Sequence, residues 1–206
     1  MFLDWVEERK NPEGKDAGAF LHNDPLDTFT VESIGKVVEE NSWRFGGDQN
    51  KTSAMCGEPS YDIFWASDTR ENRLVSMQRI ASVSGLCYMD EASNMAIHPQ
   101  FGPWLSFRAV TLFHVVGNDI DREGDGAAQP LPKQVPNPLS NQEEMNARRF
   151  VEKAFDKNAS KDSCAEFLIA ARDSVVLGRH EHRFSDSQLM YHYTKDVRYL
   201  EGLHVM

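Results

Sequence analysis

The stretch IHPQFGPWLSFRAVTLF, residues 97–113, joins a turn to a long apolar run. The run predicts a strand over 105–116, and because both of its faces are largely apolar we expect a central strand of a sheet. Arg108 lies in the middle of that strand. A guanidinium does not lose its proton in proteins, and burying it without a partner is costly. Either a carboxylate of the same chain or a ligand must therefore meet Arg108.

Length and composition place the chain among globular proteins. Its 206 residues are 40% apolar, which is enough for one domain, 1–206, with a sizeable core. The net charge of −10 argues against a non-specific nucleic-acid binder and against docking on anionic membranes. No apolar run approaches the roughly 18 residues of a membrane span. Three dispersed cysteines fit a reducing compartment, so we expect a cytoplasmic protein.

The first half of the chain predicts two helices and a short strand. Asp24-Pro25 opens a helix that ends by Asn41, between loops at 10–23 and 46–60. Tyr61–Trp65 is a strand candidate. Asp68 is expected to cap a second helix over 69–88, whose middle carries only small side chains. A thin helix packs closely against a sheet, or alternatively lets a large flat ligand approach the backbone.

The second half predicts a strand, a long connection and three helices. Met95–Ile97 is the strand, and 117–139 is an irregular Pro-rich connection that could serve as a lid. Three capping boxes predict helices near 141–157, 164–177 and 186–196. The boxes are Ser140 with Glu143, Ser163 with Glu166, and Ser185 with Gln188. Gly178 is expected to close the second helix. Because the helices gather at the end, an α+β fold is favoured over a βαβ repeat.

Motifs with a known chemistry are scarce. The sequence has no Walker loop, no GxGxxG after a strand, no nucleophile elbow, no HExxH and no CxxC, and we predict no metal site. Residues 179–183, RHEHR, could bind a metal if extended, although a solvated charged loop is the simpler interpretation. His98 has either a catalytic or a packing role. Asp90 and Glu91 are either acids of a site or an acidic surface pair. The later arginines either bind carboxylates of a ligand or form internal ion pairs.

These residues resemble a known family. The run from Ile97 to Arg108 is similar to the corresponding run of the methylmalonic aciduria and homocystinuria type C protein family, the cobalamin-processing cyanocobalamin reductases and alkylcobalamin dealkylases. Three weaker stretches agree in order and extend the resemblance over about 20–195; they lie at 23–37, 61–88 and 183–188.

The resemblance implies a fold, a site and a chemistry. The fold is a flavin nitroreductase-like α+β sandwich with a central antiparallel sheet and C-terminal helices. The residues that would line the corrin are Val75, Ser76, Met77, Gln78, Met89, Asp90, Glu91, Ala96 and Phe107, and the arginines that would hold glutathione are Arg108, Arg149 and Arg183. Cobalamin bound base-off would lose cyanide to a reduced flavin, FAD or FMN, or an alkyl group to the glutathione thiolate. The further partner implied for this chain would be a downstream cobalamin-trafficking protein or a larger assembly.

The chain departs from the family at several points. The family has strand and helix sequence before the part matched by Met1–Asn23, so either the chain lacks one wall of the cavity or the sequence is truncated at its N-terminus. Pro103 replaces a glycine, Ser82 replaces a histidine, and 88–91 brings acids to an expected binding surface. The alternative is therefore a non-enzymatic scaffold or assembly subunit that keeps the fold and has lost the pocket. A nitroreductase-like flavoenzyme without cobalamin is a third option, whereas epoxyqueuosine reductases are disfavoured because their cysteine cluster is absent.

Overall fold

The computed structural model describes residues 2–10, 24–41, 60–114 and 132–201. The chain divides into two compact units. Unit 1 contains residues 1–29, 78–106 and 132–206, and unit 2 contains 30–77 and 107–131. The described part combines helices with two small antiparallel sheets, which confirms the α+β class. No helix within it is both long and apolar enough to cross a membrane.

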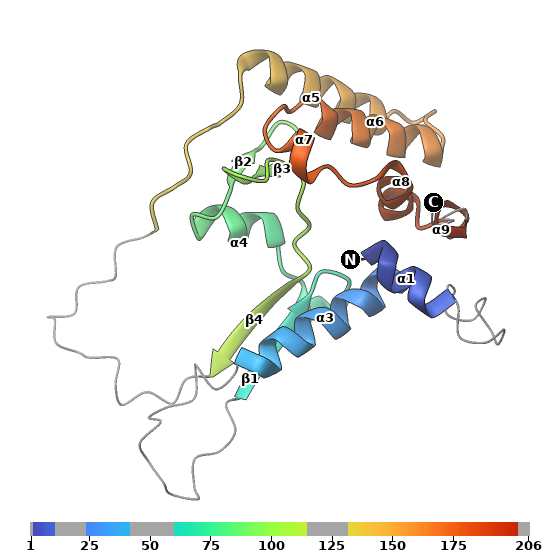
Figure 1. Ribbon diagram of the computed structural model, residues 1–206. Helices are drawn as coiled ribbons and strands as arrows, with labels where there is room; N and C mark the ends of the chain where they lie inside the picture. Colours follow the sequence, from blue (N-terminus) through green and yellow to red (C-terminus); the bar gives the residue numbers. More distant parts are fainter. Residues whose placement is uncertain (1, 11–23, 42–59, 115–131, 202–206) are drawn as a thin grey trace, which may run out of the picture. The chain divides into compact units, whose positions relative to one another are not determined.

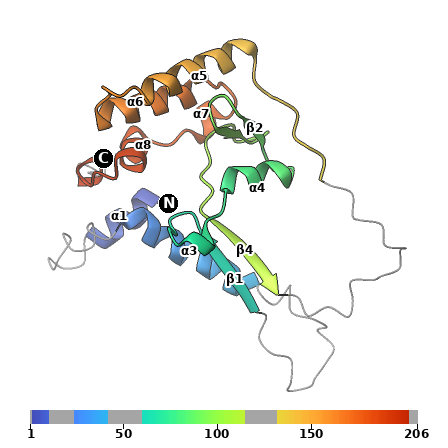
Figure 2. The ribbon, with the colours of Figure 1, turned by 180° about the vertical axis from the view of Figure 1, so that it is seen from behind.

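Two antiparallel helices form one side of unit 1. Helix α5 (Asn141–Ala154) and helix α6 (Lys161–Asp173) lie side by side in both views (Figures 1 and 2). The predicted capping box of α5 is confirmed, because the Ser140 side chain accepts a hydrogen bond from the Glu143 N–H and the Glu143 side chain bonds back to the Ser140 backbone.

The predicted cap of the second helix is wrong. Helix α6 begins three residues earlier than expected, because the Ser160 side chain caps it by accepting from the Ser163 N–H. Gly178 does not close α6, which ends at Asp173. It instead adopts a left-handed φ of 71° immediately before the short helix α7 (Arg179–His182). The third prediction holds in part: the Ser185 side chain caps helix α8 (Asp186–Thr194) by accepting from the Gln188 N–H, and the helix ends two residues before the expected 196.

An aromatic core joins the N-terminal and C-terminal helices of unit 1. Helix α1 (Phe2–Lys10), which the sequence did not predict, buries Phe2 and Val6. They pack with the start of helix α3 (Pro25–Asn41), with α8 and with helix α9 (Arg198–Glu201). The buried residues of this core are Phe2, Val6, Leu26, Tyr191 and Leu200. Removing such apolar surface from water is the main favourable contribution to folding.

A partly exposed polar clamp lies beside this core. The Tyr191 hydroxyl donates to Asp24 Oδ1 at 2.8 Å, and Lys195 Nζ lies 2.8 Å from Asp24 Oδ2. Burial alone would raise the pKa of Asp24, but the hydrogen bonds from Lys195 and Tyr191 and the charge of Lys195 lower it below its ordinary value. Asp24 thus ties the start of α3 to the end of α8. The predicted opening of α3 at Asp24-Pro25 and its end at Asn41 are both confirmed.

The turn at residues 98–102 is held by a backbone contact between its two ends. His98 and Gly102 exchange two backbone hydrogen bonds of 2.9 Å, and Gly102 has a φ of 60°. A Cβ added to Gly102 would lie 1.9 Å from the Leu177 carbonyl oxygen, and one added to Gly178 would lie 2.5 Å from the Phe101 carbonyl. Both positions therefore require glycine for space as well as for conformation.

Unit 2 holds an antiparallel ribbon. Strand β1 (Ser60–Trp65) pairs with strand β4 (Ala109–His114), with Ile63 opposite Thr111. The prediction of a central strand over 105–116 is wrong within the described residues, since 104–108 are not strand and β4 pairs only with β1. Apolar residues on both faces do not distinguish a fully covered strand from one in a ribbon whose side chains are half-buried.

The predicted helix over 69–88 is also wrong. Only helix α4 (Met77–Val83) forms, and a 3₁₀ turn (Glu71–Arg73) precedes it. Gly85, at a φ of 73°, ends α4, because the Leu86 and Cys87 N–H groups then bond back to the Ala81 carbonyl. Residues 88–90 are strand instead. Of the predicted connection over 117–139, only 132–139 is described, and it has no regular secondary structure.

We expect Gly102→Ala to lower the free energy of unfolding by about 2–4 kcal/mol, combining a left-handed alanine with an overpacked contact. Urea unfolding measures the change. Gly35→Ala in α3 is the control, with an effect of opposite sign. A Cβ at Gly35 meets nothing within 4 Å, so this variant should raise the free energy of unfolding by about 0.5–1 kcal/mol. Equal stability of Gly102→Ala and the wild type would contradict the close contact.

We expect Asp24→Asn to cost about 1–2 kcal/mol at pH 7, through weakened hydrogen bonds to Tyr191 and Lys195. Because folding lowers the pKa of Asp24, its contribution is present above the ordinary value of 3.8 and is lost as the pH falls through the folded pKa. The stability difference between the variant and the wild type should therefore shrink towards pH 3. A difference that does not change with pH would refute the clamp; Glu40→Gln, on an exposed helix face, is the control.

Candidate functional site

A small hairpin carries the centre of the predicted cobalamin surface. Strand β2 (Tyr88–Asp90) pairs antiparallel with strand β3 (Met95–Ile97), and Met89 lies directly opposite Ala96. Opposite residues of an antiparallel pair point to the same face. The structure therefore brings together two predicted corrin contacts, Met89 and Ala96, and both are half-buried.

Asp90 is a structural acid of this hairpin. Its side chain is buried, and its carboxylate accepts the Ser93 hydroxyl and the Ser93 N–H, the latter at 3.1 Å. It also accepts a longer bond of 3.4 Å from the Ala92 N–H. The interpretation of Asp90 and Glu91 as a surface pair is therefore wrong for Asp90, whereas Glu91 is exposed. The Asp90 carboxylate is occupied in closing the turn.

Gln78 belongs to the same neighbourhood. It lies in the first turn of α4, and its Nε2 is 3.5 Å from the Asn94 carbonyl oxygen in the hairpin turn. Gln78, Met89 and Ala96 are thus assembled in unit 1. Val75, Ser76 and Met77 precede Gln78 in the chain but belong to unit 2, where Ser76 is exposed and the other two are half-buried.

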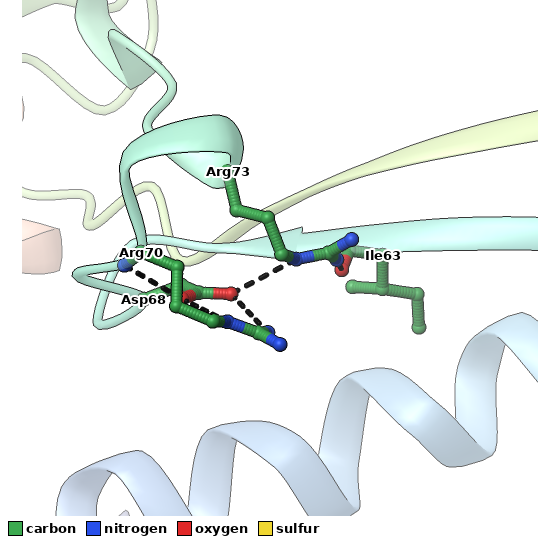
Figure 3. A network of polar contacts seen from close by, with 4 residues as sticks. All are labelled: Ile63, Asp68, Arg70 and Arg73. Atoms are coloured by element: carbon green, nitrogen blue, oxygen red, sulfur yellow. Dashed lines mark hydrogen bonds and ion pairs between the residues drawn. The ribbon is translucent and has the colours of Figure 1, made fainter.

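A polar network in unit 2 orders the chain that leads to Val75. Asp68 accepts hydrogen bonds from Arg70 and from Arg73 Nε, the latter at 2.9 Å (Figure 3). The Arg73 guanidinium also donates to the Ile63 carbonyl of β1 and lies 4.5 Å from the Phe64 ring centroid. The hydrogen bonds from Arg70, with smaller contributions from Arg73, hold the pKa of Asp68 well below its ordinary value. Asp68 therefore binds two arginines rather than capping a long helix.

Phe107 and Arg108 lie just before β4 in unit 2, and both are half-buried. The Arg108 carbonyl accepts a 2.8 Å hydrogen bond from the Ala66 N–H, which continues the pairing of β1 with β4 by one step. Arg108 is therefore positioned by the entrance of the ribbon rather than by the middle of a strand.

Arg183 meets carboxylates of its own chain. Its Nε and Nη2 bond Asp173 at 2.7 and 3.0 Å, and Nη1 lies 2.8 Å from Asp186. These interactions, led by the hydrogen bond to Asp173, raise the pKa of Arg183 above its ordinary value. The guanidinium also lies 5.7 Å from the Trp104 ring centroid. A glutathione carboxylate would have to displace Asp186, whose side chain is 83% exposed.

The neighbouring arginines of α5 differ from one another. Arg148 pairs with Glu152 at 2.9 Å along the helix. Arg149 is exposed, and its guanidinium lies 5.4 Å from the Phe150 ring centroid. Of the three predicted glutathione residues, Arg149 and Arg183 belong to unit 1 and Arg108 to unit 2.

His98 and His182 pack around the turn at 98–102. His98 Nδ1 accepts the Gln100 and Phe101 N–H groups at 3.0 and 3.2 Å, and the Phe101 ring contacts both His98 and His182. His98 thus has a packing role. Residues 179–182 are helical rather than extended, and no group of three or more metal-ligating side chains occurs in the part of the chain that the structure describes.

Sequence reasoning missed Asp173, the main partner of Arg183. The two residues are ten positions apart and separated by a turn and α7, so no helical or strand spacing connects them.

Comparisons with protein-family models, with curated proteins and with solved structures each found no match.

We expect Arg183→Lys to destabilise unit 1 by about 1 kcal/mol, because lysine makes neither the bidentate bond to Asp173 nor the planar contact with Trp104. The measurement is urea unfolding monitored by tryptophan fluorescence. Arg148→Lys, which changes only an exposed pair along α5, should leave stability within error. Equal effects of the two variants would show that the Arg183 pair contributes no more than a surface pair.

Proposed function

We propose that this protein binds cobalamin base-off and removes its upper ligand, by reductive decyanation with a reduced flavin and by dealkylation with glutathione. The proposal rests first on the similarity of 97–108 to the cobalamin-processing family. On the same resemblance, its fold is a nitroreductase-like variant of the α+β class.

The observation that carries the proposal is the hairpin pair Met89–Ala96, with Gln78 at its turn. Two half-buried apolar side chains on one face suit the apolar rim of a corrin, and a nearby amide suits its polar amide side chains. Because Ser93 and Ala92 occupy the Asp90 carboxylate, this acid does not place an unsatisfied negative charge beside the ligand.

Glutathione recognition is assigned to arginine because guanidinium forks match carboxylates. Arg108, Arg149 and Arg183 are each candidates on the resemblance, and each is taken by itself because Arg108 belongs to unit 2 and the other two to unit 1. Arg183 has a place in the set only if a glutathione carboxylate takes the position of the exposed Asp186. The chain's own contribution is to position the thiolate and the corrin, and the bound corrin and flavin supply the redox chemistry.

The test is an absorption titration of methylcobalamin and cyanocobalamin with the purified protein. We expect a shift to the base-off spectrum, followed by a second change on adding glutathione or reduced flavin. Met89→Gln should weaken the first shift several-fold. Tyr88→Phe, whose side chain points to the opposite face of the hairpin, should leave it unchanged.

The second arm uses Arg108→Ala. A folded variant that still gives the base-off spectrum but no longer dealkylates methylcobalamin with glutathione would support the assignment of Arg108. If the wild type itself leaves both spectra unchanged at high protein concentration, the proposal fails and the scaffold alternative takes its place.

A further inference from the structure

The β1–β4 ribbon of unit 2 has an outer edge on each of its two strands. The Ala66 N–H donates to the Arg108 carbonyl, one step beyond the pair Trp65–Ala109. In an antiparallel ladder, residues that bond the partner strand alternate with residues whose backbone groups face away from it. The residues that face away are Tyr61, Ile63 and Trp65 of β1, and Ala109, Thr111 and Phe113 of β4.

The outer edge of β1 is occupied by the chain itself. The Arg73 guanidinium donates to the Ile63 carbonyl, as Figure 3 shows. The Trp65 carbonyl accepts the Asp68 N–H at 3.1 Å. Because Asp68 also binds Arg73 Nε at 2.9 Å, the network that follows β1 is fixed against this edge and blocks the addition of another strand.

The outer edge of β4 has no comparable protection. Among the described residues, β4 pairs only with β1, and the backbone groups of Ala109 and Thr111 that face away from β1 make no hydrogen bond to any of them. The strand, AVTLFH, contains no proline, lysine or acid, which are the residues that commonly protect an exposed edge. The Leu112 side chain is 52% exposed. An apolar edge of this kind favours pairing with another strand.

The sequence of β4 fits a second copy of itself. In an antiparallel pair centred on Thr111, this residue would lie opposite its counterpart and exchange two backbone hydrogen bonds with it. Threonine pairs are favourable across strands. Ala109 of one copy would lie opposite Phe113 of the other, so that a small side chain leaves room for a ring. The exposed Leu112 would lie opposite Val110, which removes apolar surface from water.

We propose that this protein forms a symmetric homodimer in which the β4 strands of two copies pair antiparallel about Thr111. The contact is isologous and closed, because each copy offers the same edge. It extends a two-stranded ribbon, which is marginally stable by itself, to a sheet of four strands. A foreign extended peptide would meet the same backbone groups, but the match of Ala109 with Phe113 and the cover over Leu112 favour a second copy. The proposal is independent of cobalamin binding.

The first test is sedimentation equilibrium of the full chain. We expect a monomer–dimer equilibrium whose larger species has twice the chain mass of 23.4 kDa. Thr111→Pro should weaken dimerisation at least tenfold, because it removes an N–H that bonds the second copy. The ribbon itself should tolerate this proline, since the Thr111 N–H faces away from β1. Circular dichroism checks that the variant is folded.

A second variant reaches the same edge through a side chain. Leu112→Lys should weaken dimerisation several-fold, because it replaces an apolar contact and brings two like charges close to the symmetry axis. The matched control is Val31→Lys in α3, where a valine that is 46% exposed receives the same charge away from the edge. This control should dimerise as the wild type does. If Thr111→Pro does not fold, Leu112→Lys decides.

A cross-linking experiment tests the register. In the proposed pair, the two residues at position 111 have Cα atoms about 5.5 Å apart, which suits a disulfide. The two residues at position 109 are offset by four residues along the strands, or roughly 13 Å. With copper phenanthroline as the oxidant, Thr111→Cys should give a covalent dimer on a non-reducing gel. Ala109→Cys should give no more than the wild type does.

Three results would overturn the proposal. One is a wild-type chain that sediments as a monomer at every concentration at which it is soluble. Another is a dimer that Leu112→Lys does not weaken, which would place the contact elsewhere on the chain. The last is equal cross-linking of Thr111→Cys and Ala109→Cys, which is incompatible with pairing about Thr111.

Discussion

The close approach of Gly102 and Gly178 is the contact on which the centre of unit 1 depends. Neither residue tolerates a Cβ, because each would overlap a carbonyl group of the facing turn. The contact is possible only when both residues adopt left-handed conformations, which glycine does at little cost. A backbone contact of this kind fixes distance more strictly than side chains do, since no rotamer change can relieve an overlap between main-chain atoms.

Several features of unit 1 follow from that contact. It places Phe101 against the His182 ring and brings Arg183 over the Trp104 ring. Arg183 in turn holds Asp173 at the end of α6 and Asp186 at the start of α8. The turn at 98–102 therefore organises the helices around it, and this gives the most specific stretch of the sequence a structural role that is separate from any ligand.

Local signals in the sequence predicted local structure well. The Ser140–Glu143 box, the Ser185 cap and the Asp24-Pro25 opening depend on groups within three residues of one another, and all three are confirmed. Asp68 shows where such reasoning fails. Its residue type suits a helix cap, but the structure gives it two arginine partners, one of which also reaches a carbonyl of β1. That network extends ten residues back to the Ile63 carbonyl, a distance along the chain that helical periodicity does not reveal.

The candidate site was predictable only in part for the same reason. The family resemblance named Met89 and Ala96 as site residues, and strand pairing brings the two together. Nothing in the sequence showed that Ser93 would occupy the Asp90 carboxylate. The same holds for other acids. Asp24 joins α3 to α8, and Asp173 holds Arg183. Glu143, at the start of α5, accepts the Val176 N–H at 2.9 Å from the turn that follows α6. These carboxylates bind donors of the chain itself, so some of the acids behind the net charge of −10 have structural roles. The acidic composition is therefore weaker evidence about binding partners than it first suggests.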